Sequence, residues 1–200
     1  MIEIDPATLD GPASHRMLTG LFVPRPIAFV GTVSEAGIPN CAPFSFANGV
    51  SSRPPVLMVA ITPRRDGSPK DTLRNARRTG EFTVNIVDEA LLERMHQASA
   101  PLPPDCSEFE ATGLTLRPSI RIQAPGIAES PATMECRVRQ IIDVEGTSAS
   151  MILGDVVLYR LRDDLLEGDR VRTDRLHVVG RLGPDTYSLV DRIITLPPVR

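Results

Sequence analysis

The chain has 200 residues, of which 42% are hydrophobic and 24% charged, so it can bury a core and is too apolar for a disordered chain. Its formal net charge of −3 gives no electrostatic basis for binding nucleic acid. No apolar run is long enough to span a membrane, and the N-terminal residues lack the pattern of a secretory signal. We therefore expect one cytoplasmic domain over residues 1–200, with no nucleic-acid or membrane partner.

Six segments have the composition of β-strands, and they cover residues 27–33, 40–46, 56–62, 81–87, 134–145 and 150–161. Apolar and charged residues alternate in the fifth segment, with Met134 and Cys136 on one face and Glu135 and Arg137 on the other. A period of two is typical of a strand with one face in water. The sixth segment is apolar on both faces, so both faces need cover.

Two short helices are predicted among these strands. The first covers residues 69–79, with Ser68 as N-cap, Asp71 at the reciprocal capping position and Gly80 past its end. The second covers residues 89–98 and has an apolar stripe at helical spacing. Many strands with only two helices favour a closed antiparallel barrel over a doubly wound α/β sheet.

The start of the first predicted helix has the features of an anion site. Its first N–H groups and the positive end of its dipole are joined by Lys70 and the hydroxyl of Thr72. The polar segment 40–52, just upstream, could hold a flat ring with polar edges. The residues thus favour a phosphorylated, ring-bearing cofactor, although an exposed and well-capped helix start is also an ordinary structural feature.

Other kinds of site have little support in the sequence. Three cysteines (Cys41, Cys106 and Cys136) form no C-x-x-C pair, and the three histidines lie far apart, so we expect free thiols and no metal site. Nucleotide-binding glycine motifs and the nucleophile elbow of hydrolases are absent. This scarcity fits a protein whose cofactor performs the chemistry.

Three stretches carry a resemblance to a known family: PRPIAFVGT, NCAPFSFANGVSSRPPVLMVAI and KDTLRNARRTGEFTVNIV. In this order they resemble the flavin reductase-like family. The likeness is strong over residues 21–87 and weaker at residues 107–110 and 177–183. It implies a mainly β fold, an antiparallel FMN-binding split β-barrel of the Greek-key type with a few short helices.

The resemblance also implies which residues lie near FMN, and it assigns no catalytic residue. The candidate cofactor-binding residues are Arg25, Thr32, Pro43, Phe44, Ser45, Phe46, Asn48, Lys70, Asp71, Thr72, His177 and Arg181. Lys70 and Thr72 would approach the phosphate, whereas Asp71 is expected to cap the helix because a carboxylate repels phosphate.

Several of these residues also have simpler interpretations. Phe44 and Phe46 point the same way in a strand, with Ser45 opposite, so we expect one of the two to fill the core. Arg25 is a candidate phosphate partner because its planar guanidinium suits two parallel contacts, and a solvated surface position is the alternative. His177 would reach the cofactor from a neighbouring subunit, or it has only a structural role.

The activity that the resemblance implies is that of a flavin reductase or flavin-dependent oxidoreductase. It would transfer hydride from NADH or NADPH to flavin, which then passes electrons to free flavin, oxygen or a partner oxygenase. The alternatives are a non-catalytic FMN-binding electron carrier or sensor, and a β-barrel interaction scaffold without flavin.

The resemblance further implies a homodimer with its flavin sites near the interface. A second subunit would cover the apolar faces of segment 150–161. Cover by the N-terminal segment or by the helix over residues 89–98 of the same chain is the alternative.

Overall fold

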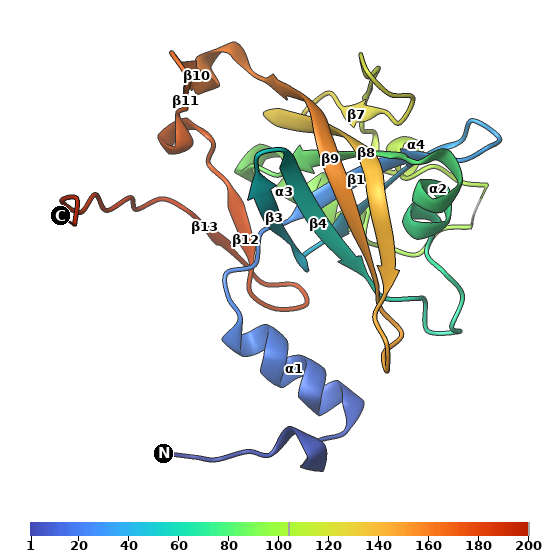
Figure 1. The fold of residues 1–200 in the computed structure, drawn as a ribbon, viewed down its shortest axis with the longest axis vertical. Helices are drawn as coiled ribbons and strands as arrows, with labels where there is room; N and C mark the ends of the chain where they lie inside the picture. The colour runs from blue at the N-terminus through green and yellow to red at the C-terminus, as the bar shows by residue number, and fades with distance from the viewer. Residues whose placement is uncertain (104, 200) are drawn as a thin grey trace.

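The computed structural model describes residues 1–103 and 105–199, and a seven-stranded antiparallel sheet forms its centre (Figure 1). The strand order is β2-β1-β5-β8-β9-β4-β3. The strands are β1 (Ala28–Val33), β2 (Pro39–Phe44), β3 (Ala47–Ser52), β4 (Pro55–Ile61), β5 (Glu81–Ile86), β8 (Ala132–Asp143) and β9 (Ser150–Leu161).

This sheet curls around one hydrophobic core, which we call the barrel core. Side chains from all seven strands pack into it, including Phe44 of β2, Phe82 of β5, Ile152 of β9 and, from the edge strand β3, Ala47. The edge strands β2 and β3 are not paired as neighbours among the described strands, so the barrel is split between them. The predicted antiparallel split barrel is confirmed.

The remaining elements are short. The helices are α1 (Gly11–Leu21), α2 (Asp71–Thr79), α3 (Leu92–Gln97) and α4 (Glu108–Thr112), with 3₁₀ turns η1 (Pro6–Thr8), η2 (Glu89–Leu91), η3 (Asp163–Leu165) and η4 (Thr173–Arg175). Three small hairpins pair β6 (Leu116–Arg117) with β7 (Gly126–Ile127), β10 (Leu166–Glu167) with β11 (Arg170–Val171), and β12 (Val179–Arg181) with β13 (Tyr187–Leu189). Among the described residues, no helix has the length and apolarity needed to cross a membrane.

A second core lies on the outer face of β1 and β2. Phe29 alternates with its inward-facing neighbours Ala28 and Val30, and it packs with Met95 of α3 and Val179 of β12. Phe109 of α4 belongs to the same cluster. This packing holds α3, α4 and the β12–β13 hairpin against β1 and β2, next to the candidate site.

The predicted strand over residues 40–46 is wrong at its end. Strand β2 stops at Phe44, and residues that we expected to remain a polar loop form β3. Since β3 is an edge strand with exposed residues from Asn48 to Ser52, small polar side chains are compatible with it. The predicted strand over residues 150–161 matches β9 at both ends.

The predicted alternation along residues 134–145 is only partly correct. Register shifts in the β8–β9 pairing, at Glu135/Cys136 and Val138/Gln140, break the period of two. Glu135, predicted to face water, is fully buried, and its carboxylate accepts hydrogen bonds from the N–H groups of Ile120 and Arg121 at 2.9 and 2.7 Å. The carboxylate thereby fixes a loop that was not visible in the strand pattern.

The predicted helices also need correction. The segment 89–98 is divided into the 3₁₀ turn η2 and the short helix α3. Helix α1 was not predicted, although its signal was present: Asp10 is the N-cap and accepts a hydrogen bond from the Ala13 N–H at 2.7 Å, and a proline lies in the first turn.

Candidate functional site

A cleft of about 760 Å³ opens at the start of α2. Its walls come from β2, from residues 63–66, from the segment 98–102 after α3 and from Arg181 of β12. Four cationic residues line it: Arg64, Arg65, Lys70 and Arg181. We call it the basic cleft.

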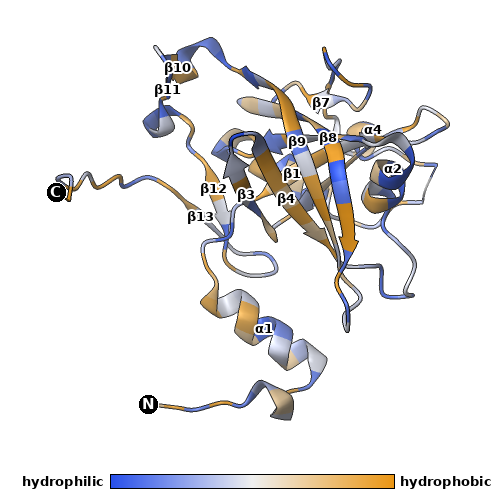
Figure 2. Cartoon of the chain, viewed as in Figure 1, coloured by the Kyte–Doolittle hydropathy of each residue, from blue (hydrophilic) through white to orange (hydrophobic). Residues whose placement is uncertain are grey.

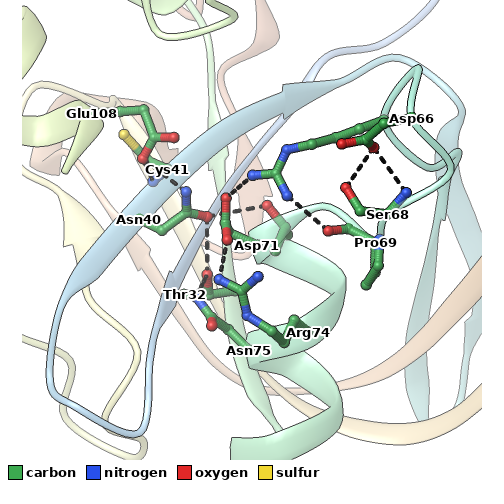
Figure 3. A network of polar contacts seen from close by, with 12 residues as sticks. Thr32, Asn40, Cys41, Asp66, Ser68, Pro69, Asp71, Arg74, Asn75 and Glu108 are labelled. Atoms are coloured by element: carbon green, nitrogen blue, oxygen red, sulfur yellow. Dashed lines mark hydrogen bonds and ion pairs between the residues drawn. The ribbon is translucent and has the colours of Figure 1, made fainter. Parts of the chain in front are cut away.

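The start of α2 differs from the predicted capping arrangement. Lys70 is the N-cap residue, and no side chain among the described residues caps the helix there. Ser68 instead donates to Asp66, from its N–H at 2.9 Å and from its hydroxyl at 2.6 Å, so the predicted Ser68 cap is wrong (Figure 3). The first N–H groups of α2 are therefore left available to an anion in the cleft.

Asp71 does not close a reciprocal cap, and the prediction that it does is wrong. Its carboxylate forms ion pairs with the guanidinium groups of Arg64 and Arg74 (Figure 3). Arg64 also donates to the carbonyl of Pro69 at 2.8 Å, which holds the loop before α2 against the helix. Arg64 and Arg74 thus neutralise the charge of Asp71, and Lys70 takes no part in these ion pairs.

Lys70 is the only lysine in the sequence. Its ammonium group lies 5.3 Å from the centroid of the Phe44 ring, and the ion pairs of the described residues do not include it. Burial lowers the pKa of Lys70, and repulsion from Arg64 and Arg181 lowers it further. An anion bound in the cleft would relieve this repulsion.

Behind the basic cleft, a buried polar network centres on Asn40. The β1–β2 register places Thr32 opposite Asn40, and α2 brings Thr72 to the same amide. The hydroxyls of Thr32 and Thr72 both donate to Asn40 Oδ1, each at 3.1 Å (Figure 3 shows this amide). Asn75 donates to the Thr32 oxygen at 3.2 Å. The Thr32 hydroxyl thus contacts the side chains of Asn40 and Asn75.

The same amide contacts Glu108, which was not among the predicted site residues. Asn40 Nδ2 donates to Glu108 Oε2 at 2.7 Å, and the Cys41 N–H donates to the same oxygen at 3.1 Å. Burial raises the pKa of Glu108, and the negative charge of Asp71 adds to this, against hydrogen bonds that favour the ionised form. The only sequence signal for Glu108 was its place in the weaker stretch over residues 107–110.

The predicted site residues between Pro43 and Asn48 lie in several different places. Pro43 lines the basic cleft, and Phe44 is buried in the barrel core, so the expectation that one phenylalanine fills the core is confirmed. The Phe46 carbonyl accepts from the Ala60 N–H at 2.8 Å, next to the first residue pair of β3 and β4. Asn48 lines a second, mostly apolar cavity of about 260 Å³ between β1, β3 and β4.

Arg25 is 2% exposed, so the alternative of a solvated surface arginine is wrong. Its guanidinium donates to the carbonyls of Thr19 and Phe22, and its Nε donates to the Ser45 hydroxyl at 3.3 Å. Burial, together with the charge of Arg181, lowers the pKa of Arg25. Arg25 thereby connects the end of α1 to the segment that follows β2.

The two late candidates lie in different environments. Arg181 lines the basic cleft, and its guanidinium donates to the carbonyls of Gly183 and Pro184, both at 3.0 Å. His177 is exposed, has a φ of 45°, and offers its carbonyl to the Glu89 N–H at 3.1 Å. It does not line the cleft.

The structure therefore brings Pro43, Lys70, Asp71, Thr72 and Arg181 together around one cleft. Phe44 lies beside Lys70, and Thr32 lies behind Thr72 through Asn40. The arrangement can bind an anion at the start of α2 and accommodate a larger organic group attached to it.

Comparison with known proteins identifies a family model and close structural neighbours. Residues 20–176 match the model of the flavin reductase like domain. An uncharacterized protein of Halalkalibacterium halodurans is 40% identical over 191 residues, which are 94% of this chain and 91% of the relative.

Two solved structures are similar over nearly their whole lengths. Nitrilotriacetate monooxygenase component B from Bacillus cereus has a TM-score of 0.94 and 34% identity, covering 98% of both chains. The 2-nitrobenzoate 2-nitroreductase NbaA of Pseudomonas fluorescens has a TM-score of 0.89 and 34% identity, covering 98% of this chain and 96% of the neighbour.

Proposed function

The chain belongs to the family of flavin reductase-like domains, and from that premise we propose that its basic cleft binds the phosphate of FMN. The observation that supports this proposal is the charge of the cleft. Lys70 has no carboxylate partner among the described residues and is repelled by Arg64 and Arg181. A phosphate at the start of α2 would remove that repulsion and accept from the free N–H groups of the helix.

The residues present fit such a cofactor. The cleft volume of about 760 Å³ is in the ordinary range for a small-molecule site. Lys70 and Arg181 would contact the phosphate, with Thr72 beside them, while Pro43 would lie along the ring. Phe44 lies in the barrel core and Asn48 lines the second cavity, so we assign neither to the ring. In this proposal Thr32 and Arg25 support the site from behind, and His177 approaches from a second subunit.

We propose that the protein is an NADH- or NADPH-dependent reductase that passes electrons to free flavin, oxygen or a partner oxygenase. Bound flavin would accept the hydride of the nicotinamide and pass on its electrons, and the chain would bind and orient the flavin. The likeness to a monooxygenase component supports an oxygenase partner. Because the sequence has no glycine-rich nucleotide motif, the nicotinamide would lie against the exposed face of the ring.

Two measurements, made one after the other, test this proposal. Protein given FMN should show the visible spectrum and quenched fluorescence of a bound flavin, and it should then consume NADH or NADPH in air. Binding without consumption of nicotinamide would favour the electron carrier or sensor. If the protein binds FMN neither when the cofactor is added to the folded protein nor when the protein is refolded with it, the proposal is refuted. The interaction scaffold without flavin is then the remaining alternative.

A homodimer is the second part of the proposal, and helix α1 supports it. Figure 1 shows α1 projecting from the barrel, and Figure 2 shows apolar residues along it. Leu18, Leu21 and Phe22 are 58%, 78% and 64% exposed. On β9, Val157 and Tyr159 are also exposed, so α1 does not cover this strand within the chain. A second subunit would bury both surfaces.

The oligomeric state can be measured by light scattering during gel filtration. We expect twice the chain mass of 21.8 kDa for the natural protein and a shift towards the monomer for Leu21→Asp. Val144→Asp, in the exposed turn after β8, is the matched control and should leave the mass unchanged. A monomer of 21.8 kDa that binds FMN tightly would refute a site shared between subunits.

A further inference from the structure

The amide of Asn40 has a fixed orientation that depends on the ionisation of Glu108. Its oxygen faces two hydroxyl donors, Thr32 and Thr72, at 3.1 Å each. Its nitrogen faces a carboxylate oxygen of Glu108 at 2.7 Å (Figure 3). A carboxylate can only accept, so the amide must present its N–H₂ group to Glu108 while Glu108 is charged.

This orientation commits the proton of Thr72. Because Asn40 Oδ1 can only accept, the Thr72 hydroxyl must donate to it, and only the lone pairs of that hydroxyl remain for the cleft. An anion at the start of α2 needs donors. In the ionised state of Glu108, the Thr72 hydroxyl therefore contributes no donor, and a negative charge remains in the cleft wall.

A protonated Glu108 reverses this pattern. Its carboxyl O–H can donate to the amide oxygen, so the Asn40 amide can turn and present its N–H₂ group to Thr72 and Thr32. The Thr72 proton is then released towards the cleft. The proton of the Thr32 hydroxyl then needs a new acceptor. The Asn75 amide can turn and offer its oxygen, because that amide makes no other hydrogen bond among the described residues.

We propose that Glu108 is a positioning residue that takes up one proton when a phosphate binds in the basic cleft, and that Asn40 transmits this protonation to Thr72, whose hydroxyl then donates to the phosphate. The proton comes from solvent or buffer and forms the O–H bond of the Glu108 carboxyl, and no other covalent bond changes. This inference rests on the proposed function, because it requires an anionic ligand at the start of α2.

The charged surroundings of Glu108 agree with such proton uptake. Burial raises the pKa of this carboxyl, so its proton is held closer to neutral pH than that of an exposed glutamate. A phosphate would add a second like charge and raise the pKa further. The Cys41 thiol of β2 lies beside it, and the other charged groups that line the same cleft are Arg64, Arg65, Asp66, Lys70, Asp71 and Arg181. Glu110 of its own helix is exposed to solvent.

Glu108→Gln tests the proposal because glutamine imitates the protonated acid in shape and in its ability to donate to Asn40. We expect FMN to bind Glu108→Gln about tenfold more tightly than the natural protein at about pH 8, which is the low end of what one hydrogen bond to a charged group contributes. Riboflavin, which lacks the phosphate, should bind both proteins equally.

Calorimetric titration in buffers of different ionisation enthalpy measures the protons taken up on binding. The phosphate of FMN titrates near pH 6 in both proteins, so the difference between them isolates Glu108. We expect the natural protein to take up about one proton more than Glu108→Gln at neutral pH. Glu110→Gln, an exposed carboxylate on the same helix, is the control and should behave as the natural protein.

A second variant keeps the test decisive if Glu108→Gln does not fold. Thr72→Val removes the hydroxyl and should reduce the change in FMN affinity on acidification to the part that comes from Lys70 and from the phosphate itself. Equal proton uptake in the natural protein and Glu108→Gln, with FMN bound to both, would overturn the inference and leave the proposed function intact. Absence of FMN binding in the natural protein would overturn both.

Discussion

Replacing Lys70 with alanine should weaken FMN binding while leaving riboflavin binding and the fold unchanged. Lys70 is the N-cap residue of α2 and makes no side-chain capping bond, so the helix does not depend on it. Its ammonium contacts the Phe44 ring and is repelled by Arg64 and Arg181. Loss of the ring contact and relief of the repulsion oppose each other, so we expect little change in the free energy of unfolding.

The expected loss of affinity follows from one charged hydrogen bond to phosphate. Such a bond contributes about 1.5–3 kcal/mol, which corresponds to a rise of roughly 10- to 150-fold in the Kd for FMN. Arg181 remains in the cleft and keeps the loss from being complete. Arg78→Ala, in the last turn of the same helix and exposed, is the matched control and should leave the Kd unchanged.

Quenching of flavin fluorescence gives both dissociation constants in one assay. Equal weakening of FMN and riboflavin by Lys70→Ala would refute the assignment of Lys70 to the phosphate. A direct measurement is also possible because Lys70 is the only lysine: reductive ¹³C-methylation labels just this side chain and the N-terminal amine. Its pKa should lie below the ordinary range in the free protein and rise when FMN, but not riboflavin, is added.

Three further predictions follow from packing, pH and thiol exposure. A Cβ at Gly154 would overlap the Phe82 ring, so Gly154→Ala should destabilise the fold by about 1–3 kcal/mol in urea unfolding. A Cβ at Gly49 meets no atom within 4 Å, so equal effects of Gly154→Ala and Gly49→Ala would contradict this packing. Burial raises the pKa of Glu108 in the folded state, so its contribution to the free energy of unfolding should fall as pH rises from about 4.3 through the folded-state pKa. Glu108→Gln should abolish that fall. Parallel curves of the free energy of unfolding against pH for the two proteins would exclude it. In a thiol titration Cys106 should react at once and the two buried cysteines only after unfolding, and any faster reaction of a second thiol would count against their burial.

The sequence predicted the elements whose residues are selected by burial on a repeating pattern. Strand β9 was predicted to the residue because apolar residues occupy both faces over most of its twelve positions. The end of α2 was predicted by Gly80, which adopts the left-handed conformation that favours glycine. Lys70 and Thr72 were predicted at the cleft because the chemistry of a helix start is local in sequence.

Tertiary structure decided the features that depend on partners far along the chain. Glu108 meets Asn40 from 68 residues away, so no local pattern could identify this carboxylate as part of the site. Arg25 is buried because the carbonyls of Thr19 and Phe22 and the Ser45 hydroxyl surround its guanidinium; the carbonyls are near in sequence, but Ser45 is 20 residues away. Glu135 is buried because a loop 14 and 15 residues before it supplies its two donors. Periodicity predicts where apolar side chains go, whereas a buried charge requires specific donors that only the folded chain brings to it.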